Sequence, residues 1–111
     1  MIRPSLLGLL LLATATPAMA QEDLSPAHAE KRLRACLVAG SSAAPRSGLS
    51  AAIPSVRAFC TPQINRVRDD RVADATAGLT GPAARRAENG AVRALNNEIA
   101  YAIANFTGLT L

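Results

Sequence analysis

Residues 36–60 read CLVAGSSAAPRSGLSAAIPSVRAFC and carry both cysteines of the chain at their ends. No Cys-x-x-Cys motif is present, so the sequence does not indicate a thioredoxin-like redox centre or a haem attachment site. Both cysteines fall on apolar faces of expected helices, where sulfur is shielded and unreactive. We therefore expect a structural disulfide between Cys36 and Cys60, worth about 3 to 4 kcal/mol of stability. A labile redox pair is the less favoured alternative.

The first twenty residues are typical of a secretory signal peptide. Arg3 supplies a positive start, residues 6–12 form a short apolar run, and residues 18–20 are a small-x-small cleavage sequence. We expect cleavage near Ala20, which would leave residues 21–111 as one small domain in the periplasm or secreted beyond it. No stretch after the signal is apolar enough to span a membrane.

A first helix is expected over residues 26–39. Ser25 can cap its free amides, and Pro26 suits the first helical position. Gly40 is the expected end of the helix. The apolar residues recur at spacings of three and four, which places Cys36 on the buried face. They are Ala29, Leu33, Cys36 and Leu37.

A second helix is expected over residues 54–77. The α-carbons of a disulfide lie within about 7 Å of each other, and a helix rises about 1.5 Å per residue, so a start near Pro54 is favoured over a start at Leu49. Pro62 lacks an amide proton and should kink or briefly break the helix. One apolar face continues through that position. Its residues are Leu49, Ile53, Val56, Cys60, Ile64 and Val67.

A third helix is expected over residues 82–106, starting at Pro82 and ending before Gly108. Gly90 lies inside it and is expected to permit close approach of another helix. The apolar stripe comprises Val92, Leu95, Ile99, Ala102, Ile103 and Phe106. The sequence thus predicts an all-α fold, a small three-helix bundle clipped by one disulfide.

Arginine supplies most of the positive charge, and the mature segment keeps a mild basic excess. Nucleic acid is a poor candidate partner, because an exported protein leaves the compartment that contains nucleic acid. In addition, only three aromatic residues follow the signal, too few for a surface that stacks on bases. An envelope protein or an anionic envelope surface remains a possible partner.

A candidate partner-contact face is rich in arginine. Acidic residues are interleaved with these arginines, so an ordinary solvated face is the favoured interpretation, and we expect Arg66 to pair with Asp70, and Arg71 with Asp74. The arginines of the candidate face are Arg57, Arg66, Arg68 and Arg71. In the first helix, Glu30 and Arg34 are one turn apart and are also expected to pair.

The sequence does not favour catalysis. His28 is the single histidine, and neither a second histidine nor clustered cysteines accompany it as metal ligands. Asp69 and Asp70 are adjacent and diverge by about 100° on a helix, which suits solvation better than paired acid and base chemistry. We expect no enzyme activity, no metal and no cofactor.

Residues 24–28, LSPAH, followed by a charged helix, and Leu79-Thr80, which precedes another helix, loosely resemble the Leu-Thr-x-x-Gln segments of the Spy/CpxP family of small helical periplasmic chaperones. The matching glutamine is absent, and Gly81 is an extra residue in the second copy. The resemblance implies a chaperone or stress-response role, which we keep as an alternative. The preferred expectation is noncatalytic binding of a protein or envelope component. Thiol-redox activity is less favoured, and self-association through residues 82–106 is a further alternative.

Overall fold

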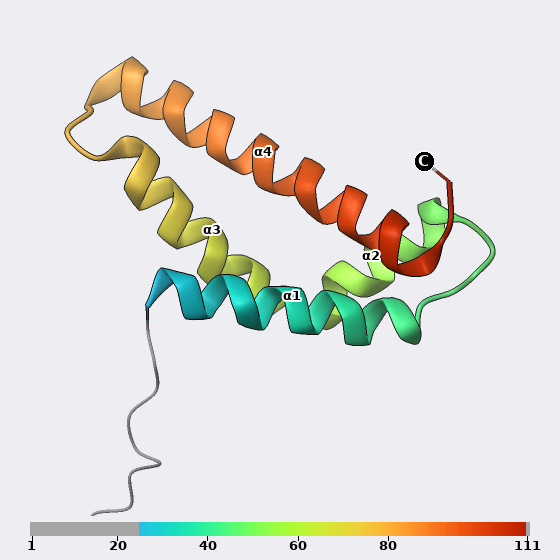
Figure 1. The fold of residues 1–111 in the computed structure, drawn as a ribbon. Helices are drawn as coiled ribbons and strands as arrows, with labels where there is room; N and C mark the ends of the chain where they lie inside the picture. The colour runs from blue at the N-terminus through green and yellow to red at the C-terminus, as the bar shows by residue number, and fades with distance from the viewer. Residues whose placement is uncertain (1–24, 111) are drawn as a thin grey trace, which may run out of the picture.

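The computed structural model describes residues 25–110, and these residues form four helices joined by short connections (Figure 1). The helices are α1 (Pro26–Ser42), α2 (Leu49–Phe59), α3 (Thr61–Thr76) and α4 (Gly81–Thr107). The all-α prediction is confirmed, although the helices number four instead of three. The predicted signal peptide and its cleavage point near Ala20 lie outside the described residues. None of the described helices is both long and apolar enough to cross a bilayer.

Helix α1 starts as the sequence predicts. The backbone N–H of His28 donates to Ser25 Oγ at 3.2 Å, and Pro26 occupies the first helical position. The helix does not stop at Gly40, however, and continues to Ser42. Gly40 is buried, and a Cβ added there would lie 3.0 Å from Phe59 Cδ1. This glycine therefore permits close contact between α1 and α2 instead of ending the helix.

Helix α2 begins at Leu49, so the predicted start near Pro54 is wrong. The Gly48 carbonyl accepts from the amides of Ala51 and Ala52, and both Leu49 and Ala52 are buried. Pro54 lies inside the helix and has no N–H to donate to the carbonyl of Ser50, an exposed residue in the first turn. The predicted start near Pro54 assumed that the first helix ends at Gly40. Because α1 extends to Ser42, the spacing of the two cysteines does not determine where α2 starts.

The predicted break near Pro62 is confirmed. Helix α2 ends at Phe59 and α3 begins at Thr61, with Cys60 between them at φ −104° and ψ 16°. Pro62 has no N–H to donate to the Ala58 carbonyl. The Thr61 hydroxyl takes its place and donates to the carbonyls of Ala58 and Arg57, at 3.1 and 3.0 Å. The interruption separates one predicted helix into two.

The expected disulfide joins α1 to this break. Cys36 and Cys60 are bonded, with their α-carbons 5.8 Å apart. Cys60 is completely buried, and a Cβ on Gly40 would lie 3.7 Å from its sulfur. Two successive turns of α1 therefore pack against one point of the α2–α3 junction.

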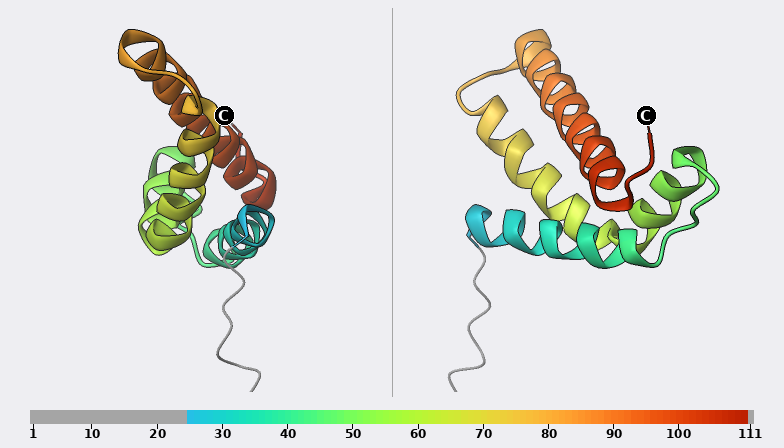
Figure 2. Two further views of the ribbon diagram at one scale, coloured as in Figure 1. Left: turned by 90° about the vertical axis from the view of Figure 1, so that its left-hand side faces the viewer. Right: turned by 45° about the vertical axis from the view of Figure 1, so that its right-hand side comes forward.

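Helices α3 and α4 form an antiparallel pair that projects away from α1 and α2 (Figure 2). Gly78 has a φ of 73° in the connection between them. No described residue between Val67 and Leu95 is buried, so the core lies at the other end of the pair. The residues with less than 2% exposure there include Val56, Val67, Ile99 and Ile103.

The end of α4 is fixed by two polar contacts. Gly108 has a φ of 72° and donates its N–H to the Ala104 carbonyl, which confirms the predicted end of the helix. Arg46, in the connection between α1 and α2, donates from Nη1 to the Thr107 carbonyl at 3.0 Å. The C-terminal end of α4 is therefore held beside this connection.

Gly40 and Gly90 provide a matched test of the helix contacts. A Cβ on Gly90 would meet nothing within 4 Å, so the expected close approach at Gly90 is wrong. We predict that Gly40→Ala destabilises the protein by about 1 to 3 kcal/mol through overpacking. Gly90→Ala should instead stabilise it by up to about 1 kcal/mol through helix propensity. Denaturant unfolding measures both effects, and equal effects of the two substitutions would contradict this packing.

Candidate binding groove

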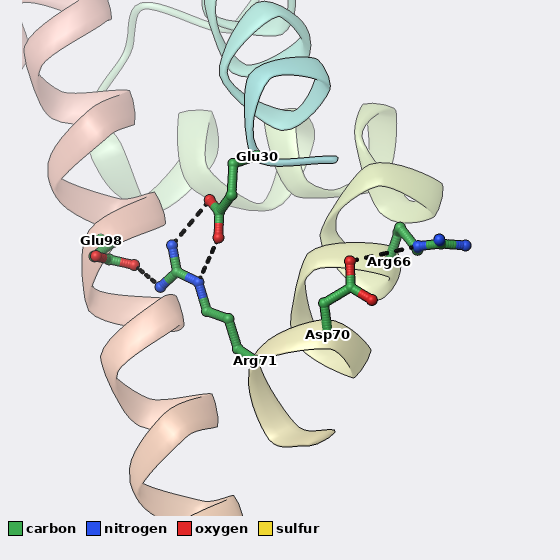
Figure 3. A network of polar contacts seen from close by, with 5 residues as sticks. All are labelled: Glu30, Arg66, Asp70, Arg71 and Glu98. Atoms are coloured by element: carbon green, nitrogen blue, oxygen red, sulfur yellow. Dashed lines mark hydrogen bonds and ion pairs between the residues drawn. The ribbon is translucent and has the colours of Figure 1, made fainter. Parts of the chain in front are cut away.

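Arg71 links three helices through its guanidinium group (Figure 3). Its Nε and Nη2 atoms donate to the two carboxylate oxygens of Glu30 on α1, at 2.8 and 3.0 Å. Its Nη1 atom donates to Glu98 Oε2 on α4. The hydrogen bond with Glu30, supported by Glu98, raises the pKa of Arg71 above its ordinary value. Arg71 therefore ties α3 to both α1 and α4 as a cation.

Two intrahelical pairs expected from the sequence are replaced by contacts between helices. Arg71 bonds Glu30 and Glu98, where a pair with Asp74 was expected. Glu30 correspondingly does not pair with Arg34, whose guanidinium carbon lies 5.8 Å from the centre of the Phe106 ring on α4. Both arginines thus connect their own helix to another one.

The structure does not gather the four arginines of the candidate contact face into one site. Arg71 belongs to the link between helices, whereas Arg66 pairs with Asp70 at 3.5 Å, as expected. Arg68 contacts its neighbour Asp69, also at 3.5 Å. Residues 66 and 68 lie about 200° apart around α3 and so point to different sides. Arg57 is on α2, beside a separate hollow of about 170 Å³.

A groove of about 220 Å³ lies between α1 and α4, and we call it the α1–α4 groove. Its apolar lining comes from the faces of α1 and α4 that the sequence predicts to be buried. The two faces pack against each other but leave a hollow between the helices. Leu33, Leu37, Leu95 and Ile99 are themselves buried within the core. The full lining is Glu30, Leu33, Arg34, Leu37, Arg71, Leu95, Glu98, Ile99, Ala102 and Phe106.

Charged side chains border this apolar surface. Arg71, with its two carboxylate partners, forms one part of the border. Arg34 forms another part and rests on the ring of Phe106. Among residues 25–110, Arg34 makes no ion pair, so its charge is not neutralised by a carboxylate. The groove therefore combines an apolar floor with one available cation.

A second hollow, of about 150 Å³, lies between α1 and α3. Arg32 and Arg66 line it together with Pro62 and Gln63. Its apolar lining is limited to Ala29 and the proline ring, and Arg66 is already paired with Asp70. The hollow is smaller than the α1–α4 groove.

The part of the chain that the structure describes contains no group of three or more side chains suited to hold a metal ion. His28 lies in the first turn of α1, where its backbone amide takes part in the cap. Cys60 is completely buried and bonded to Cys36, so no thiol is exposed at this junction. The α1–α4 groove is the described feature best suited to hold another molecule.

Sequence reasoning placed the aliphatic residues that line the groove in the core, and the structure confirms this, but it gave no sign of the groove itself. The spacing of Leu33 and Leu37, or of Leu95 and Ile99, shows which side of a helix is apolar. It does not show how closely two such sides meet, because the crossing of the helices is set by contacts elsewhere. No sequence signal marks the link from Arg71 to Glu30 either, since they are far apart along the chain.

Comparison of the chain with protein-family models, curated proteins and solved structures finds no match.

The link made by Arg71 can be tested against a neighbouring arginine. Arg71→Met should lower the free energy of unfolding by about 1 to 2 kcal/mol, because three charge-assisted hydrogen bonds are lost and two carboxylates are left together. Arg68→Met is the matched control and should change stability by less than about 0.5 kcal/mol, since Arg68 contacts only Asp69. Chemical denaturation of both variants gives the comparison. Equal losses would show that Arg71 does not link the helices.

Proposed function

We propose that this protein is a noncatalytic binding protein that holds an apolar group of a protein or envelope component in the α1–α4 groove. The observation that carries the proposal is the groove itself, a hollow of about 220 Å³ between α1 and α4 that is bordered by apolar and charged side chains. Burial of such a group removes apolar surface from water, and the charged border adds selectivity.

The proposal places the protein in the periplasm or outside the cell, after removal of residues 1–20. The sequence of that segment supports export. The Cys36–Cys60 bond is consistent with an oxidising compartment, where disulfides persist. Within such a compartment we take the bond to act as a structural clip, which is supported by the complete burial of Cys60 and the partial burial of Cys36.

A chaperone-like role is the second candidate, and it rests on a different observation. Within residues 25–110, four large apolar side chains are exposed outside the groove and could make weak contacts with unfolded chains. They are Val38, Phe59, Leu79 and Tyr101. The groove favours one bound group in one place, whereas these separated residues favour many clients held loosely.

Photo-cross-linking from single positions tests the proposal. A photoreactive amino acid at Ala102 lies in the groove, whereas the same residue at Ala94 lies on an exposed part of the same helix. We predict that the protein, expressed with its own export signal, gives a product from position 102 in constant ratio and at least about tenfold less from position 94. Many different cross-linked products in equal yield from both positions would contradict binding in the groove and favour the chaperone-like role.

A further inference from the structure

Phe59 is a large apolar side chain that the fold leaves exposed beside the disulfide. It is 63% exposed, although it directly precedes Cys60, which is completely buried and bonded to Cys36. One edge of its ring rests on α1, because a Cβ added to Gly40 would lie 3.0 Å from Phe59 Cδ1. An aromatic ring that is already held in place loses little conformational entropy when a partner covers it. Phe59 is therefore suited to anchor a bound molecule.

Two arginines from different helices lie at the same junction. Arg32 on α1 and Arg66 on α3 line the hollow of about 150 Å³, and no carboxylate is among its lining residues. Arg32 makes no ion pair within residues 25–110, and Asp70 contacts Arg66 at 3.5 Å. Two guanidinium groups beside one carboxylate leave a net positive charge there. An anionic group is complementary to this charge.

The two arginines and the ring of Phe59 lie along one face of α1. Arg32, Cys36 and Gly40 are four residues apart in turn, so they follow one another along that face. Pro62, which lines the hollow, follows Phe59 by only three residues. Because a helix rises about 1.5 Å per residue, the turn of Arg32 and the turn that contacts Phe59 are about 12 Å apart. An extended peptide rises about 3.3 Å per residue and covers this distance in about four residues.

We propose that this surface, which we call the Arg32–Phe59 face, docks an acidic segment of a partner protein. The segment binds in an extended conformation and places its carboxylates at Arg32 and Arg66. An apolar side chain about four residues along the segment covers the ring of Phe59. Arginine and aromatic residues are also the side chains in which protein interfaces are enriched.

This docking surface goes beyond the proposed function, because it lies on another side of α1 from the α1–α4 groove. Arg32 lines the hollow beside α3, whereas Arg34 lines the groove beside α4. The two residues are about 200° apart around the helix. A segment docked on the Arg32–Phe59 face therefore leaves the groove accessible.

Binding of short acetylated peptides to the isotopically labelled protein, exported with its own signal, tests the proposal by nuclear magnetic resonance. The probe is Glu-Glu-Ser-Gly-Trp, and its two controls replace both glutamates by lysine or the tryptophan by serine. The probe should shift the backbone amide resonances of Arg32 and Phe59 in a saturable manner. Each control should bind at least about threefold more weakly, since each lacks one of the two complementary groups. Added salt should weaken binding of the probe, because it screens exposed charges.

Two pairs of variants assign the binding to this face. Arg32→Gln and Phe59→Ser should each weaken binding of the probe by at least about threefold, because one removes a cation and the other removes the ring. Arg93→Gln and Tyr101→Ser are the matched controls and should leave the affinity unchanged, since both residues are exposed on α4. The thermal unfolding midpoint of each variant shows that it remains folded.

Absence of saturable binding of the probe, or equal effects of Arg32→Gln and Arg93→Gln, would overturn the proposal. Binding of phosphatidylglycerol vesicles in place of the probe would assign the face to a membrane, and a dimer that Phe59→Ser abolishes would assign it to a second copy. Binding that appears only after Glu22→Gln and Asp23→Asn would assign it to the chain's own carboxylates. Each of these three outcomes also contradicts a partner segment. The photo-cross-link from Ala102 decides the proposed function separately.

Discussion

The contact of α1 with the junction at Cys60 is the constraint on which the other helix positions depend. The disulfide brings Cys36 to the junction, and the missing side chain of Gly40 allows the next turn of α1 to approach the same place. The junction exists because Pro62 interrupts the backbone hydrogen bonds. The direction in which α3 leaves the core is therefore fixed where α1 is also anchored.

The groove results from two attachments that act on different helices. The disulfide holds α1 to the α2–α3 junction, and Arg71 holds α3 to both α1 and α4. Neither attachment brings the apolar faces of α1 and α4 into full contact along their length. The space that remains is bordered by core residues such as Leu33 and Ile99 and by the charged side chains around Arg71.

Features set by local chemistry could be predicted from the sequence. The cap at Ser25, the break near Pro62 and the end of α4 at Gly108 each depend on residues within one turn. The pairing of Cys36 with Cys60 followed because the chain has no other cysteine. These features have in common that no knowledge of helix crossing is needed to infer them.

Features set by packing between helices could not be predicted. Gly40 and Gly90 look alike in sequence, yet one lies at a helix contact and the other has open space around it. The start of α2 at Leu49 was missed because the predicted first helix was shorter than α1 is in the structure. Likewise, the partner of Arg71 lies on another helix, so the spacing of charges along α3 pointed to the wrong carboxylate.

The most direct test of the central claim is xenon titration of the methyl-labelled protein, because xenon is an apolar probe without a head group. The account predicts saturable shifts at Leu33, Leu37 and Ile99 that disappear in the Ala102→Leu variant. Absence of saturable shifts at these methyl groups, or larger shifts at exposed residues such as Leu79, would contradict an apolar binding groove between α1 and α4.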